Sequence, residues 1–256
     1  MPRASNSYPR NEITGYLDSL FDGFTGEDST YNGLQVEGAG EITAAAFGVD
    51  CSLEGFRRAA DEGCQLLVTH HGLIWGGWSS VAGNDYLRLK TLIDNQINLY
   101  VRHLPLDIHP EYGNNAGIIR ALGAERKEVF AEYGFFAEFP SALSAKEFRP
   151  LVAEKINPDS EFMDFGPDRI ERIAVCSGSL RPGYLAGAVS GGAQALVTGE
   201  GSSPSLFYYP ALESKIHIAF AGHYATEVYG VRSLMELVKK NFPELKTIWI
   251  DMPTGW

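Results

Sequence analysis

Residues 65–72 have the sequence Gln65-Leu66-Leu67-Val68-Thr69-His70-His71-Gly72. The short apolar run predicts a buried strand, and two histidines follow directly where this strand should end. A second run of the same kind, Gln194-Ala195-Leu196-Val197-Thr198, occurs later in the chain and precedes Gly199-Glu200-Gly201. Buried strands with polar residues at their carboxyl ends are typical of the parallel sheets of α/β proteins, where ligands collect at those ends.

The correspondence between the two parts of the chain extends beyond these runs. Upstream, Val49-Asp50-Cys51-Ser52 matches Val175-Cys176-Ser177. Downstream, the apolar run 97–101 precedes His103-x-x-x-Asp107, and the apolar run 216–220 precedes His223-x-x-x-Glu227. We therefore interpret the chain as two duplicated α/β halves. The alternative is that any two βαβ units resemble each other at this level of detail.

Apolar runs that alternate with segments of helical period predict mostly parallel sheets in both halves. We place the boundary between 123 and 130, which gives domains at 1–125 and 126–256. Ser144 with Glu147 predicts a capping box that opens a helix over 145–153, and the stretch 157–168 predicts a surface connection. The predicted strands lie near 43–49, 65–69 and 97–101 in the first half, and near 171–176, 194–198 and 216–221 in the second.

Composition excludes several classes of protein. No apolar signal segment opens the chain and no stretch approaches the roughly 20 apolar residues of a membrane span, so we expect a cytoplasmic protein with no membrane partner. Cys51, Cys64 and Cys176 have no C-x-x-C spacing, which predicts small buried side chains rather than disulfides or a thiolate zinc site. The net charge of −11 makes nucleic acid a poor candidate partner.

Histidines and acids follow the predicted strands and suggest metal ligands. The candidates are His70, His71, Asp107, His223 and Glu227. Imidazole and carboxylate donors together suit zinc, iron, manganese, nickel or cobalt better than calcium or magnesium. Five donors exceed the four of a tetrahedral zinc, and a carboxylate can bridge two ions, so we expect two divalent ions per chain.

Each of these features also has a structural interpretation. Adjacent histidines in a strand point to opposite faces, so His70 and His71 could be one packed and one exposed side chain. His223 and Glu227, four residues apart, could form an ordinary contact on a solvated helix face. His103 fits proton transfer as well as a role in supporting the ligands through hydrogen bonds.

Other polar and aromatic residues allow simpler explanations. Asn32-Gly33 predicts a turn, Asn114-Asn115 predicts a helix cap, and Gly199-Glu200-Gly201 predicts a turn that lines a pocket without binding metal. The loop that contains Trp75 and Trp78 could be a lid, a base-stacking platform or a contact with a neighbouring subunit. We expect His109 and His217 to be surface or packing residues.

Taken together, the motifs resemble the dinuclear-metal-centre YbgI family, whose members are also called GTP cyclohydrolase 1 type 2 homologues and Nif three-like proteins. The resemblance runs in order from about residue 11 to the C-terminus, and only 124–170 matches loosely. The motifs that carry it are Tyr31–Gly38, Thr69–Gly72, His103–Asp107 with Gly113–Asn115, Thr198–Glu200 and Gly222–Glu227.

The resemblance implies two similar α/β domains that face each other across a two-metal site, within a toroidal homohexamer. It implies the same ligands, His70, His71, Asp107, His223 and Glu227, with His103 beside them. The implied activity is metal-dependent hydrolysis of a carbon–nitrogen bond, with GTP ring opening as the family name suggests. The alternative is a ring-forming metal-binding or regulatory protein that acts through protein or nucleic-acid partners without turnover.

Overall fold

The chain folds into two compact units in a computed structural model that describes residues 6–24, 26–77, 80–201 and 204–255. One unit comprises residues 1–106 and 231–252, and the other comprises 107–230 and 253–256. We expected a single cut between 123 and 130. The difference arises because the chain returns to the first unit within its last long helix, so its final strand joins the first sheet.

The first unit contains a five-stranded sheet in which three of the four pairings are parallel. This arrangement confirms the predicted strands near 43–49, 65–69 and 97–101 and the mostly parallel sheet. Its strands, in spatial order, are β13 (Lys246–Trp249), β4 (Ala44–Gly48), β5 (Leu66–Thr69), β6 (Asn98–Val101) and the antiparallel β2 (Gly33–Val36). A separate two-stranded ribbon pairs β1 (Tyr8–Pro9) with β3 (Glu41–Ile42).

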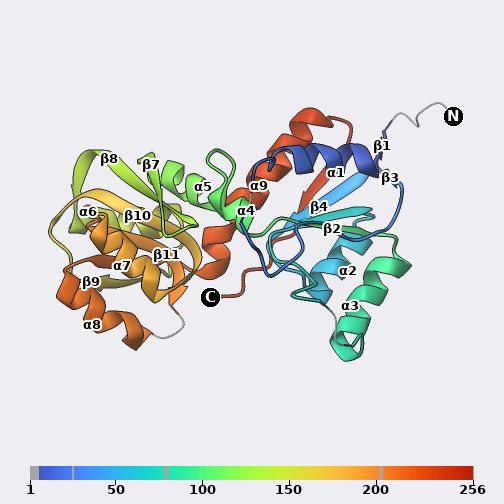
Figure 1. Cartoon of the computed structure of the whole chain (residues 1–256). Coiled ribbons are helices and arrows are strands. Elements are labelled where there is room, and N and C mark those ends of the chain that lie inside the picture. The colour runs from blue at the N-terminus through green and yellow to red at the C-terminus, as the bar shows by residue number, and fades with distance from the viewer. Residues whose placement is uncertain (1–5, 25, 78–79, 202–203, 256) are drawn as a thin grey trace. The chain divides into compact units, whose positions relative to one another are not determined.

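Helices cover both faces of this sheet (Figure 1), which explains why β4, β5 and β6 are buried along their whole length. One core cluster joins Ile13 and Leu17 to Phe47 and Val68, and the opposite cluster joins Phe56 to Leu67 and other residues. The helices of the first face are α1 (Arg10–Ser19) and the second part of α9 (His223–Asn241); those of the other are α2 (Leu53–Asp61) and α3 (Gly83–Asp94). The short α4 (Leu104–Ile108) leads the chain out of the unit.

The second unit contains a six-stranded mixed sheet, with three antiparallel pairings and two parallel ones. The predicted strands near 171–176, 194–198 and 216–221 are confirmed as the central strands, but the expectation of a mostly parallel sheet is wrong for this unit. Its strands, in spatial order, are β7 (Glu125–Phe130), β8 (Gly134–Ser144), β10 (Arg169–Leu180), β11 (Ala195–Gly201), β12 (His217–Phe220) and β9 (Glu161–Asp164).

The second sheet is also packed on both faces, as the two separate clusters of buried residues show. The helices α5 (Asn114–Ala121) and α6 (Ala145–Lys155) contribute to one cluster, and α7 (Pro182–Ser190) and α8 (Pro204–Ser214) contribute to the other. The predicted capping box of Ser144 and Glu147 is present at the start of α6. The expected surface connection over 157–168 is wrong in part, because β9 forms an edge strand there and pairs with β12.

Each unit contains three consecutive parallel strands connected by helices, β4-α2-β5-α3-β6 in one and β10-α7-β11-α8-β12 in the other. This shared order is what a duplication predicts. Burial raises the pKa of the Cys64 thiol to about 11 and raises that of Cys176, in keeping with small buried side chains, whereas Cys51 is partly exposed. None of the helices among the described residues combines the length and apolar character needed to cross a bilayer.

Candidate metal centre

Three histidines converge in the first unit. His70 and His71 follow the end of β5, and His103 precedes α4. Ring nitrogens of the three side chains all lie within 4.8 Å of one another, and the ring centroids of His70 and His71 are 4.8 Å apart. The two neighbours are not on opposite faces because they lie beyond the strand, where the backbone N–H groups of both donate to the carbonyl of Val49.

Each of these histidines is held through its Nδ1 atom. The Nδ1 atoms lie 3.0 Å from the carbonyl oxygen of Arg102 for His70, 2.6 Å from Asp50 Oδ1 for His71, and 2.9 Å from Asp28 Oδ1 for His103. A carbonyl or carboxylate oxygen only accepts, so each Nδ1 carries the proton and the lone pair of the neutral ring lies on Nε2. Metal-binding histidines are oriented in this way in proteins.

Asp28 organises the surroundings of His103. Its Oδ1 atom accepts from His103 Nδ1 and the Thr30 backbone N–H, and its Oδ2 atom accepts from Asn32 Nδ2 and the Leu104 backbone N–H. Burial raises the pKa of Asp28, but the hydrogen bonds from His103 and Asn32 outweigh it and lower the pKa to about 2. Asp28 is therefore ionised and fixes the His103 ring. No local pattern in the sequence indicates this role, because 75 residues separate the partners.

The predicted turn and aromatic loop both adjoin this histidine cluster. Gly33 has a φ of +124°, but it opens strand β2, so the predicted turn is wrong. Asn32 accepts a hydrogen bond of 2.7 Å from the His103 backbone N–H. Trp75 donates from Nε1 to the Gly72 carbonyl, and its ring meets the His103 ring edge-on with centroids 5.0 Å apart. Trp78 lies outside the described residues, so its predicted roles stay predictions.

Asp107 and Glu227 bring two buried carboxylates together in the second unit. Only 7% of Asp107 and 3% of Glu227 is exposed, and oxygens of the two side chains lie within 4.8 Å of each other. The Oδ1 atom of Asp107 accepts from Ser177 Oγ at 2.7 Å and from Asn114 Nδ2 at 2.9 Å. Two buried like charges at this separation are costly unless a cation or a proton compensates them.

The asparagines that follow Asp107 were predicted as a helix cap, and this prediction is wrong. Gly113 is the N-cap of α5 and makes no side-chain cap, and both asparagines are fully buried. Asn114 holds Asp107 and accepts from the Gly230 backbone N–H, while Asn115 accepts from the Ser177 backbone N–H. Their amides serve tertiary contacts, for which both donor and acceptor atoms are needed.

His223 and Glu227 lie one turn apart at the start of α9, with 3.1 Å between His223 Nε2 and Glu227 Oε1. His223 Nδ1 lies 2.9 Å from Glu200 Oε1, so Glu200 orients this histidine as Asp50 orients His71. Close glycines leave room for the pair. A Cβ atom at Gly178, whose φ is +66°, would lie 2.5 Å from Glu227 Oε1.

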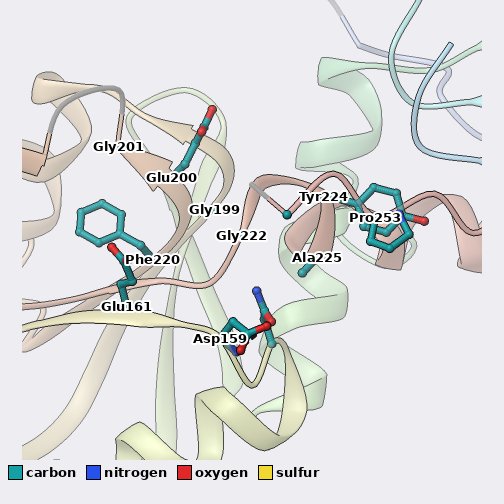
Figure 2. A pocket seen from close by; sticks show the side chains of 12 residues that line it. Asp159, Glu161, Gly199, Glu200, Gly201, Phe220, Gly222, Tyr224, Ala225 and Pro253 are labelled. Atoms are coloured by element: carbon teal, nitrogen blue, oxygen red, sulfur yellow. Dashed lines mark hydrogen bonds between the residues drawn. The ribbon is translucent and has the colours of Figure 1, made fainter. Parts of the chain in front are cut away.

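Glu200 lines a pocket of about 500 Å³, as predicted (Figure 2), but it lies in strand β11 and not in the predicted turn. Its hydrogen bond with His223 was not predicted, since it depends on how β11 and β12 are placed side by side. His217 is buried and bonded to the Pro167 carbonyl, and His109 stacks on Tyr112, so both are confirmed as packing residues.

Both units thus present imidazole and carboxylate groups that are buried or fixed by hydrogen bonds. This donor chemistry fits divalent transition metals. The fold and these groups together define the protein as a mixed α/β protein with candidate metal-binding groups at strand ends. The sequence model of the Duf34/NIF3 (NGG1p interacting factor 3) family matches residues 9–254. The chain belongs to this family.

Similar proteins agree with this assignment. A GTP cyclohydrolase 1 type 2 homolog from Pyrococcus abyssi is 40% identical over 252 residues, which cover 96% of this chain and 99% of the relative. The solved structure of protein ybgI, described as of unknown function, has a TM-score of 0.89 at 31% identity and covers 96% of this chain and 99% of that one. The structure of TTHA1606 from Thermus thermophilus has a TM-score of 0.85 at 31% identity, with 97% and 100% covered. The predicted family and α/β fold are confirmed.

Proposed function

We propose that this protein is a dinuclear-metal hydrolase whose ligands are His70, His71, Asp107, His223 and Glu227. The observation that carries the proposal is the buried pair Asp107 and Glu227, whose oxygens lie within 4.8 Å of each other. Two carboxylates are kept from water at this separation, and an oriented imidazole lies beside Glu227. A divalent cation bound here would offset the cost of burying the two negative charges. His70 and His71, each with the lone pair on Nε2, would supply neutral nitrogen donors.

Bound divalent ions would supply Lewis acidity, lowering the pKa of water and polarising the bond under attack. The protein's own part is to move a proton. His103 is suited to accept it at Nε2, because Asp28 holds Nδ1–H and stabilises the positive charge that the ring then acquires. Trp75 covers one edge of this ring, which limits the orientations that His103 can adopt.

The substrate class that we propose is a cyclic compound with a hydrolysable carbon–nitrogen bond. Support comes from relatives named GTP cyclohydrolase 1 type 2 homolog, with identities of up to 40%. A nucleotide such as GTP is therefore the first substrate to test.

We also propose that the protein acts as a toroidal homohexamer in the cytoplasm. Exposed apolar side chains on α8 support self-association, since Tyr209 is 66% and Leu206 49% exposed, and exposed apolar patches mark interaction surfaces. Light scattering coupled to size exclusion would give the mass of six chains, and a monomeric mass would contradict this part.

The activity is tested by screening the purified, metal-loaded protein for formate release from GTP and for hydrolysis of cyclic amides. We expect activity that Glu227→Ala abolishes and that a chelator removes reversibly, whereas Asp61→Asn, an exposed substitution on α2, should leave it unchanged. Full metal occupancy without turnover on any class of compound would contradict the hydrolase. That result would favour a metal-binding protein that acts through protein or nucleic-acid partners.

A further inference from the structure

The residues that line the pocket of the second unit include none of the proposed metal ligands and not His103. It lies beside His223, and its lining comes from the loop before β9, the first residue of β9, the ends of β11 and β12, the first turn of α9 and the tail after β13. Figure 2 shows Glu161 and Phe220 on one side and Asp159 below Gly222. At about 500 Å³ it can hold a small organic molecule.

The charges of the lining have one sign. Asp159, Glu161 and Glu200 are among the twelve lining residues, and none of the twelve is a lysine, arginine or histidine. Glu200 is engaged by His223 and Ser179. The carboxylates of Asp159 and Glu161 make no ion pair or side-chain hydrogen bond within the described ranges, whereas neighbouring Asp164 pairs with Arg149. An anionic group such as a phosphate would be repelled from this pocket.

Aromatic rings accompany the acids. Phe220 on β12 is the cross-strand partner of Glu161 on β9, so a ring and a carboxylate stand next to each other on the pocket wall. Gly201 leaves room for this ring, because a Cβ atom there would lie 3.0 Å from Phe220 and from Phe207. Tyr224 adds a second ring to the lining. An aromatic face beside a carboxylate is suited to an organic cation.

The acids are too dispersed for a single bare metal ion. Among the described residues, the groups of three donors that close within 4.8 Å do not include Asp159, Glu161 and Glu200. These carboxylates can instead meet separate N–H groups of an extended ligand.

We propose that this pocket binds a small organic cation that carries an amine or guanidinium group. The idea that the bound cation is a substrate rests on the proposed function, because the pocket lies beside His223 and would present the bound molecule to the metal ligands. As a binding site it does not depend on metal. If the substrate is a nucleotide, its phosphates would lie outside this pocket.

The test uses butylguanidinium and its neutral isostere butylurea as probes of the full-length protein, with affinity measured by calorimetry in the metal-loaded and the chelator-treated states. We expect butylguanidinium to bind at least about tenfold more tightly than butylurea in both states. Glu161→Gln and Phe220→Leu should each weaken it about two- to fivefold. Glu213→Gln removes the same charge outside the pocket and should leave the affinity unchanged.

Equal binding of the two probes would overturn the proposal, because it means that the pocket does not recognise the cationic charge. Equal weakening by Glu161→Gln and Glu213→Gln would also overturn it, because it means attraction to the net negative charge of the protein alone. Glu161 is exposed, so its variant keeps the test valid if Phe220→Leu does not fold. Specific binding without any hydrolase activity would leave the pocket standing and remove the proposed reaction. Activity without binding of butylguanidinium would remove the pocket alone.

Discussion

Single residues define the candidate centre through close contacts that leave little free volume. Asp107 and Glu227 are buried together, and a Cβ atom at Gly178 would collide with the Glu227 carboxylate. The five proposed ligands could be predicted from the sequence because they follow apolar strands. The groups that orient Asp107, His223 and the neighbouring His103 could not be predicted. These groups, Ser177, Glu200 and Asp28, each reach their partner across a sequence gap that only the fold closes.

Gly199→Ala tests this crowding. A Cβ atom at Gly199 would lie 2.5 Å from the Gly178 carbonyl oxygen and 2.9 Å from His223 Cα, and backbone atoms cannot move aside cheaply. We expect a loss of about 1–3 kcal/mol in the free energy of unfolding, measured by urea denaturation. Gly183→Ala is the matched control, since it lies in α7 with open space around it. It should be neutral or stabilising by up to about 1 kcal/mol; equal losses would contradict the geometry.

At the scale of elements, the central strands could be predicted because they are short and continuously apolar. The edge strands β7 and β9 could not: β7 is mostly exposed and charged, and β9 lies in a stretch that contains proline and glycine. Their strand structure comes from pairing with β8 and β12 rather than from local propensity. These antiparallel edges and the antiparallel pairing of β8 with β10 make the second sheet mixed.

Ser144→Ala tests the one helix start that the sequence predicted in detail. The Ser144 hydroxyl and backbone N–H both bond to Glu147, and the reciprocal cap closes the first turn of α6. Removal of the hydroxyl should cost about 1 kcal/mol of stability, visible as a lower midpoint in thermal unfolding followed by circular dichroism. Glu147→Gln keeps an acceptor at this position and should cost less. A larger effect from Glu147→Gln would show that the cap does not work in this way.

For the whole molecule, the division into units depends on the return of the chain through α9. The sequence suggested a single cut, because nothing local indicates that residues 231–252 belong with the first sheet. The parallel pairing of β13 with β4 and the burial of Leu245 and Ile250 bind this segment there.

Two truncations test this return. A chain that ends at Asn241 lacks β13 and exposes the β4 edge, so we expect the first unit to lose cooperative unfolding and become sensitive to protease. A chain that ends at Met252 keeps β13 and should unfold like the full-length protein. Limited proteolysis with mass spectrometry distinguishes the two, and an equally resistant shorter chain would contradict the observed organisation.

The central claim is that the five proposed ligands hold two divalent ions, and elemental analysis of the purified protein tests it most directly. We predict about two ions per chain in the natural sequence, with a clear loss in His71→Ala and in Glu227→Ala and full retention in Glu213→Gln. A metal-free protein that takes up no zinc, iron, manganese, nickel or cobalt on addition, or variants that retain both ions, would contradict the account.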